Sequence, residues 1–151
     1  MEPVRIRACT HNDIDALLQL DRQWEQEQIA HNFTPISRNE FLTALERFPA
    51  YFLVAESDRR IVGYINGSVR LHKWVAVLPE GEPYVEIENV YVHPDFRHRH
   101  IGGQLMERLF AVAAHHGIQR FVVSSTSKEM DKILHFYRRH GFTPWYVQLF
   151  K

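Results

Sequence analysis

Hydrophobic and polar residues alternate along the chain with two different periods, and each period predicts a kind of element. Val4, Ile6 and Ala8 alternate with Arg5 and Arg7, which predicts an amino-terminal strand. Elsewhere, apolar residues three and four positions apart predict helices, because that spacing places them on one helical face. On these grounds we expect strands at residues 4–8, 51–56, 60–71, 85–92, 121–125 and 142–150, and helices near residues 14–24, 38–48, 101–116 and 131–140.

The order of these elements predicts one mixed α/β (α+β) domain. Ser37 and Glu40 form a capping box before the second helix, and Gly117 and Gly141 are expected to end the last two helices. A hairpin of strands precedes strands that alternate with helices, which indicates a sheet that is antiparallel at first and has crossover helices later. The 151 residues contain no repeat and no linker, so residues 1–151 are expected to form a single domain.

The hydrophobic phase changes within the strand expected at residues 85–92. Val85 and Ile87 alternate in one phase, whereas Val90 and Val92 alternate in the opposite phase. One extra residue near positions 88–89 would reconcile the two phases, and a β-bulge supplies such a residue. A bulge also frees backbone N–H groups and splays the strand from its neighbour. A regular strand with one misfit residue is the alternative.

A basic turn rich in backbone donors follows this strand. The sequence RHRHIGG at residues 97–103 leads into a helix with an apolar stripe at Ile101, Leu105 and Leu109. The first N–H groups of a helix lack intrahelical partners, and the helix dipole favours negative charge there. The turn therefore predicts a site for a phosphate-bearing ligand, and a solvated surface loop is the alternative.

Composition narrows the function classes. The formal net charge is zero, which argues against a nonspecific polyanion binder, and no nucleic-acid recognition module accompanies the basic turn. No apolar run approaches membrane-spanning length, and the charged amino terminus lacks the apolar stretch of a secretory signal. Cys9 is the only cysteine, which fits a reducing compartment, so we expect a cytoplasmic protein. No carboxylate or cysteine pattern completes a metal site around the ten histidines, so we expect no bound metal.

Two segments resemble the GNAT N-acetyltransferase superfamily. Residues 92–105 follow the pattern Val-x-Pro-x-x-Arg-x-x-x-Ile-Gly-x-x-Leu, which is similar to motif A of that family. Residues 133–142, ILHFYRRHGF, are similar to motif B, in which a tyrosine is followed four and five residues later by Gly-Phe. The resemblance implies a mixed, mostly antiparallel sheet that is splayed at a bulged strand and has helices on both faces.

The resemblance also implies acetyl-CoA as the acyl-donor cosubstrate. The backbone of the turn and helix start would hold its pyrophosphate, which corresponds to Arg97, His98, Arg99, His100, Ile101, Gly102 and Gly103. The bulged strand would lie along the pantetheine arm near Val90, Tyr91 and Val92, with an N–H near Val90 polarising the acetyl carbonyl. His100 replaces the first glycine of motif A. This departure predicts either weaker CoA binding or an added proton-dependent charge near the pyrophosphate.

Three residues are candidates for proton transfer. Tyr137 corresponds to the motif B tyrosine that lies near the CoA sulfur and protonates the leaving thiolate, and core packing is its alternative role. An amine must lose a proton before it attacks, so a base is also needed. Glu86 lies eleven positions before Arg97, the spacing of the general-base glutamate in the histone-acetylating branch of the family. Glu88 follows two residues later. Glu86 is favoured as the base, and for both residues the alternative is a strand-face carboxylate without a catalytic role.

Together these features predict transfer of acetyl from acetyl-CoA to a primary amine of a small molecule, by direct attack in a ternary complex. A protein or peptide N-acetyltransferase is one alternative, and a noncatalytic acyl-CoA-binding sensor is another. Ser125 stands where ribosomal-protein acetylases of the family often carry a glutamate, and Met130 stands where many members carry an asparagine. The first departure argues against a ribosomal-protein substrate.

The acceptor is expected to enter beside the first two helices, between residues 24–33 and 71–84. Trp24, Glu25, Glu27 and Phe33 combine aromatic and acidic groups that would suit a cationic acceptor, but helix packing is the preferred interpretation. Near the carboxyl terminus, Trp145, Val147 and Leu149 either belong to the core or pair between chains in a homodimer.

Overall fold

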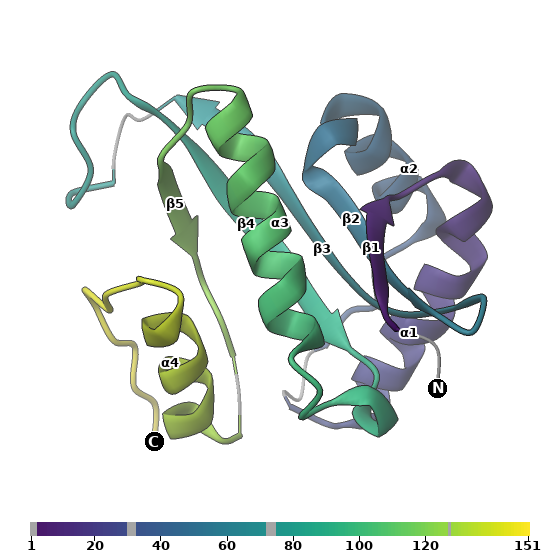
Figure 1. Ribbon diagram of the computed structural model, residues 1–151. Helices are drawn as coiled ribbons and strands as arrows, with labels where there is room; N and C mark the ends of the chain where they lie inside the picture. Colours follow the sequence, from purple (N-terminus) through teal and green to yellow (C-terminus); the bar gives the residue numbers. More distant parts are fainter. Residues whose placement is uncertain (1–2, 30–32, 72–74, 127) are drawn as a thin grey trace.

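The chain forms five strands and four α-helices in the computed structural model, which describes residues 3–29, 33–71, 75–126 and 128–151 (Figure 1). In chain order the elements are β1 (Arg5–Ala8), α1 (Ile14–Gln26), α2 (Arg38–Arg47), β2 (Phe52–Ser57), β3 (Arg60–Leu71), β4 (Pro83–Val92), α3 (Ile101–His115), β5 (Arg120–Val123) and α4 (Met130–Arg139). One sheet contains all five strands in the order β1-β2-β3-β4-β5. Only the β4–β5 pair is parallel, so the predicted mixed, mostly antiparallel sheet is confirmed.

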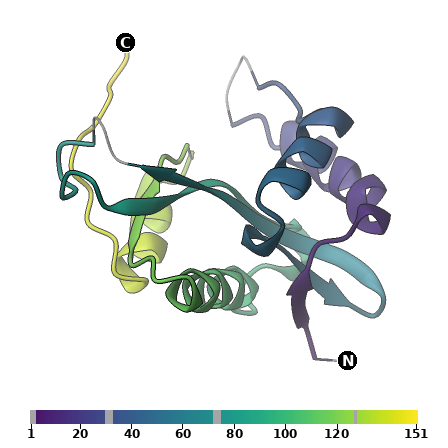
Figure 2. The same cartoon turned by 90° about the horizontal axis from the view of Figure 1, so that it is seen from above.

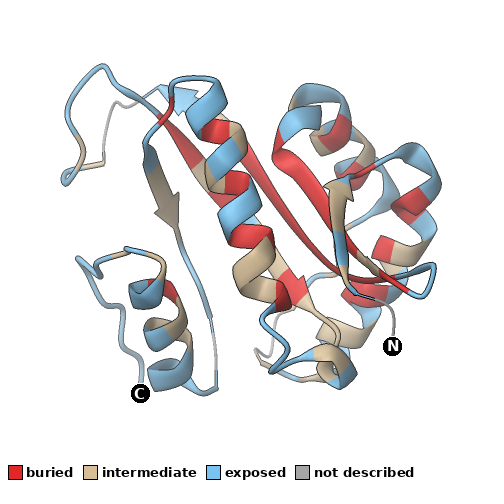
Figure 3. Ribbon diagram, in the orientation of Figure 1, coloured by how far each residue is buried: buried red, intermediate tan, exposed pale blue. Residues whose placement is uncertain are grey.

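Helices cover both faces of the sheet, as the resemblance implied. Figure 2 shows α1 and α2 on one face and α3 on the other. Each face has its own apolar cluster, one built around Leu17, Phe41 and Tyr64 and the other around Leu105 and Leu109. The most buried parts of the molecule are the central strands and the side of α3 that faces them (Figure 3).

Local sequence rules account for where the helices and the hairpin begin and end. At the start of α2, the Glu40 carboxylate accepts the Ser37 N–H at 2.7 Å and the Ser37 hydroxyl accepts the Glu40 N–H at 3.2 Å, so the predicted capping box is confirmed. Gly117 and Gly141 follow α3 and α4 with φ values of +75° and +88°, which glycine adopts without strain. The turn between β2 and β3 has positive φ at both Asp58 and Arg59, as a two-residue hairpin requires.

β4 contains the bulge that the change of hydrophobic phase predicted. Asn66 of β3 pairs with Asn89, and the next residue, Gly67, pairs with Ile87, so Glu88 is the extra residue. A Cβ at Gly67 would lie 2.8 Å from a Val85 methyl carbon, which explains why glycine stands there. The parallel pairing with β5 ends at Ile87, so β4 and β5 part where the bulge begins. One irregularity thus sets both the strand geometry and the splay of the sheet.

The prediction of a strand at residues 142–150 is wrong. No strand is present after α4, and Trp145, Val147 and Leu149 are exposed rather than part of the core. Alternating apolar residues show a preference for extended backbone, but a strand also needs a neighbour, and Pro144 cannot donate to one. The prediction for β5 also ran too far, because the strand ends at Val123. Pairing between chains through this segment stays a prediction.

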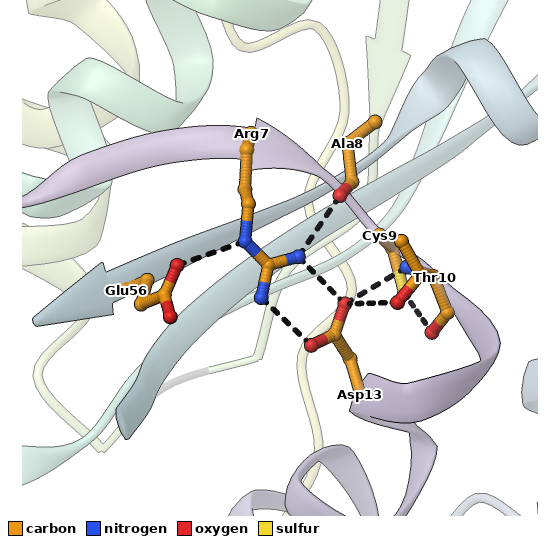
Figure 4. A network of polar contacts seen from close by, with 6 residues as sticks. All are labelled: Arg7, Ala8, Cys9, Thr10, Asp13 and Glu56. Atoms are coloured by element: carbon orange, nitrogen blue, oxygen red, sulfur yellow. Dashed lines mark hydrogen bonds and ion pairs between the residues drawn. The ribbon is translucent and has the colours of Figure 1, made fainter. Parts of the chain in front are cut away.

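A polar network fixes β1 to β2 and to the first turn before α1 (Figure 4). Arg7 donates to both carboxylate oxygens of Asp13, each at 2.8 Å, and its Nε donates to Glu56 at 2.9 Å. Asp13 also accepts the Thr10 backbone N–H at 2.8 Å, so Thr10 is the N-cap of this turn. Burial raises the pKa of Asp13, but the hydrogen bonds from Arg7 and Thr10 outweigh it and leave the pKa below its ordinary value.

Candidate active site

The turn between β4 and α3 presents consecutive backbone donors. The first intrahelical bond of α3 runs from the Gln104 N–H to the His100 carbonyl at 3.0 Å. The N–H groups of Ile101, Gly102 and Gly103 precede that bond, at the positive end of a 15-residue helix. Ile101 is buried and anchors this end in the core. Of the residues expected to hold a pyrophosphate, Ile101, Gly102 and Gly103 thus form the helix start, whose N–H groups have no intrahelical acceptor.

His100 has a left-handed backbone conformation, with φ of +60° and ψ of +18°. This is the position where motif A of the family carries glycine, and the structure supplies the physical reason, since glycine adopts this conformation at no steric cost. Another residue pays roughly 1–2 kcal/mol for it. The departure therefore does not prevent the turn from forming, but it stores strain in the predicted phosphate site.

We expect His100→Gly to stabilise the fold by about 0.5–1 kcal/mol, because it relieves the left-handed strain and loses part of that gain to unfolded-state entropy. Urea unfolding measures the change. The matched control is His135→Gly in the middle of α4, where the residue is exposed and helical. That control is expected to lose about 1 kcal/mol. A loss of stability in both variants would contradict the assigned conformation of His100.

The side chain of Arg97 is directed away from the helix start. Its Nε donates to the Val92 carbonyl at 2.9 Å, and its two terminal nitrogens donate to Glu27 of the loop after α1 at 2.7 and 2.9 Å. Arg99 lies over the Phe96 ring at 5.2 Å. Gly102 and Gly103 face α4, where an added Cβ at either position would lie 3.4 Å from a side-chain ring. Among these residues, backbone groups rather than the Arg97 guanidinium are available to a phosphate.

Both glutamates of β4 point to the same arginine. Arg70 of β3 forms a short ion pair with Glu86, and a terminal nitrogen of Arg70 lies 3.6 Å from Glu88. The Ser68 hydroxyl donates to Glu88 at 2.8 Å. The bulge therefore leaves Glu86 and Glu88 on one face of the sheet, each about one-third exposed. Sequence reasoning missed Arg70 and Ser68, whose positions opposite the glutamates depend on the strand register.

A pocket of about 450 Å³ opens between α2 and the bulge. One wall is formed by residues of β3 and β4 around the bulge, among them Asn66, Ser68, Arg70, Glu88 and Asn89. The other wall is formed by residues of α2 and its flanks, between positions 36 and 48. The pocket is on the face of the first two helices, and its walls differ from those expected for acceptor entry, which stays a prediction. Glu86 is not among the lining residues, whereas Glu88 is.

Trp24 and Glu27 contact Tyr91 of β4 and do not line this pocket. Trp24 stacks on Tyr91 with ring centroids 4.9 Å apart and lies 5.8 Å from Phe33. This agrees with the helix-packing interpretation of these aromatic residues. Residues 30–32 and 72–74, which belong to the two predicted walls, lie outside the described residues.

Tyr137 approaches the splayed strands from the α3 side. Its side chain is buried in the same apolar cluster as Val85 and Ile87, and it packs edge-on against Phe136 and Phe142. Burial raises the pKa of Tyr137, and a side-chain hydrogen bond with Ser125 partly opposes this rise. Val85 and Ile87 face away from Glu86, so Tyr137 and the glutamates lie on opposite sides of β4. Beyond Ile87, β4 no longer pairs with β5.

Two further sequence predictions concern metal ligands and membrane-spanning helices. In the described part of the chain, no three histidine, cysteine, aspartate or glutamate side chains gather in a way that could hold a metal ion. In the same ranges, no helix has both the length and the apolar character needed to cross a membrane.

Comparison with known proteins gives this geometry a context. The acetyltransferase (GNAT) family matches residues 14–142. The amino-acid acetyltransferase of Escherichia coli K12 is 28% identical over 146 residues, which cover 96% of this chain but only 28% of that protein. The chain therefore spans little more than a quarter of the length of the curated relatives that it matches.

Solved structures share the fold. An aminoglycoside acetyltransferase from an uncultured soil metagenomic sample, in complex with trehalose, has a TM-score of 0.72 and 22% identity, covering 98% of this chain and 95% of that one. A predicted acetyltransferase from Clostridium acetobutylicum, with acetyl-CoA, has a TM-score of 0.72 and 20% identity, covering 97% and 96%.

Proposed function

Because the chain belongs to the acetyltransferase (GNAT) family, whose members use acetyl-CoA, we propose that it acetylates a primary amine of a small molecule by direct attack in a ternary complex. The observation that carries this proposal is the bulge at Glu88. At the bulge, β4 separates from β5. On the face of β4 opposite to Tyr137, Glu88 lines the pocket beside α2. A donor and an acceptor can thus reach one strand from two sides.

The residues of the turn and the bulged strand fit an acyl-CoA donor. The N–H groups of Ile101, Gly102 and Gly103 would bind the pyrophosphate at the positive end of α3. Val90 follows the bulge, where a backbone N–H can be directed at the acetyl oxygen as charge develops on it. Acetyl-CoA would supply the activated acyl group, and the chain would supply position and polarisation.

On the acceptor side we assign Glu88 as the base, rather than Glu86. Glu88 lines the pocket and lies at the bulge, whereas the carboxylate of Glu86 is paired closely with Arg70. The hydroxyl of Ser68 and the guanidinium of Arg70 would orient the Glu88 carboxylate. Glu88 would accept the ammonium proton directly or through water, which frees the lone pair of the nitrogen for attack.

On the donor side we assign Tyr137 as the acid. Its buried hydroxyl has a raised pKa, so it stays protonated at neutral pH and can give a proton to the departing thiolate. Ser125 would orient the hydroxyl and replace part of its lost hydration.

Pocket size favours a small acceptor over a protein. A volume of about 450 Å³ falls within the range of roughly 300–1,000 Å³ typical of small-molecule sites. The curated relatives are named as amino-acid acetyltransferases and some solved neighbours as aminoglycoside acetyltransferases, so both kinds of amine belong in the first screen.

Two measurements test the proposal. Calorimetric titration with acetyl-CoA, with CoA as the control, is expected to give a dissociation constant on the order of 1–10 μM. Release of free thiol is then followed with amino acids, aminoglycosides and amine-bearing peptides. Turnover of a small amine supports the proposal. Turnover of peptides alone would assign the chain to protein substrates, and binding without any turnover would favour the sensor.

A further inference from the structure

One carboxylate joins three separate parts of the molecule. Glu27 accepts two hydrogen bonds from the Arg97 guanidinium, at 2.7 and 2.9 Å, and a third from the Tyr91 hydroxyl at 2.7 Å. Arg97 belongs to the turn that leads into α3, and Tyr91 belongs to the end of β4. Seventy positions separate Glu27 from Arg97, so this contact ties the loop after α1 to the predicted donor site.

Stacked rings restrict the contact that Glu27 makes with Tyr91 and Arg97. Tyr91 is 4% exposed, Trp24 stacks on its ring at 4.9 Å, and the Arg97 guanidinium lies 5.4 Å from the centre of that ring. The Nε of Arg97 also holds the Val92 carbonyl. An arginine that is bidentate to a carboxylate, stacked on a ring and bonded through Nε to the backbone has little freedom left. The path of the chain from Val92 into the turn is therefore fixed by Glu27.

The position of Glu27 is unfavourable for α1 itself. The residue is the C-cap of that helix, where the negative end of the dipole disfavours a carboxylate. Burial also opposes its ionisation, but the hydrogen bonds from Arg97 and Tyr91 outweigh burial and lower the pKa of Glu27. The negative charge of Glu27 at this helix end is therefore explained by its hydrogen bonds with Arg97 and Tyr91, and not by a contribution to the stability of α1.

We propose that Glu27 is a positioning residue for acetyl-CoA binding, which acts through Arg97 and contacts no part of the substrate. The proposal rests on the function proposed above. With its guanidinium held by Glu27, Arg97 orients the turn so that the N–H groups at residues 101–103 face the pyrophosphate. Loss of Glu27 lets the turn relax, and the donors then lose their common direction.

The test compares Glu27→Gln with a matched variant, Glu25→Gln. Glu25 is exposed and lies two positions earlier on α1, about 200° around the helix. We expect Glu27→Gln to raise the KM for acetyl-CoA and its dissociation constant by about tenfold, with kcat and the amine KM within about twofold. Glu25→Gln is expected to match the wild type. A merely structural role would lower the active fraction, and with it the apparent kcat, without this selective rise.

A double-mutant cycle with Arg97→Gln separates the mechanisms. If Glu27 acts through Arg97, Arg97→Gln alone gives a similar loss of affinity, and Glu27→Gln adds nothing in that background. Additive losses would overturn the proposal, because Arg97 would then act on the phosphate independently. Unchanged or tighter acetyl-CoA binding by folded Glu27→Gln protein would also overturn it. Wild-type protein that does not bind acetyl-CoA would instead refute the proposed function, which keeps the two failures distinct.

Discussion

Replacing Tyr137 with phenylalanine is expected to lower kcat by about two to three orders of magnitude, while the acetyl-CoA dissociation constant changes by less than about twofold. The substitution removes only the hydroxyl and leaves the ring that packs against Phe136 and Phe142. Thiol release at saturating substrates measures kcat, and calorimetry measures donor affinity. The exposed Tyr146, changed to phenylalanine, is the control for a lost tyrosine hydroxyl.

The pH profile of the wild type gives a second readout of the same group. An acid must be protonated to act, so activity is present below its pKa and lost as the pH rises through it. Because burial raises the pKa of Tyr137 above its ordinary value of 10, the alkaline limb attributed to this residue lies above pH 10. Undiminished turnover by Tyr137→Phe would assign the acid role elsewhere, and a sensor would bind acetyl-CoA equally well in both forms.

Short-range patterns in the sequence predicted those features that are fixed by backbone geometry. The opposite phases of Val85 and Val90 located the bulge, because side chains alternate along a strand and one extra residue reverses them. The capping box at Ser37 and the helix ends at Gly117 and Gly141 also depend only on neighbouring residues. The resemblance to motifs A and B then predicted how these elements are arranged, in one sheet with helices on both faces.

Contacts between distant segments were beyond such patterns. Arg70 meets Glu86 and Glu88 only because of the β3–β4 register, and that register depends on the bulge itself. Glu27 was noted as an acidic residue near aromatic ones, but nothing local pairs it with Arg97. The strand prediction for the carboxyl-terminal segment failed for the same reason. Alternating apolar residues indicate a preference for extended backbone, but they do not specify a neighbouring strand.

The largest loss of stability is expected at Asp13, far from the candidate active site. Asp13→Asn keeps the size of the side chain but replaces one acceptor oxygen with an amide donor that faces the Arg7 guanidinium. Asp13 is 6% exposed and bonds both Arg7 and the Thr10 N–H, so the change takes the anion away from both donors and leaves Arg7 with Glu56 alone. We expect a loss of about 3 kcal/mol, which is typical when one partner of a buried ion pair is removed.

Urea unfolding at neutral and acidic pH measures this loss and identifies its electrostatic part. The folded-state pKa of Asp13 lies below its ordinary value of 3.8, so the carboxylate contributes its full stability above that value. As the pH falls through the folded-state pKa, the wild type loses this contribution, and its advantage over Asp13→Asn shrinks. Asp58→Asn, in the exposed turn between β2 and β3, is the control for a lost aspartate charge. A difference between wild type and Asp13→Asn that stays constant down to pH 2 would mean that packing, not the ion pair with Arg7, holds β1 to the start of α1.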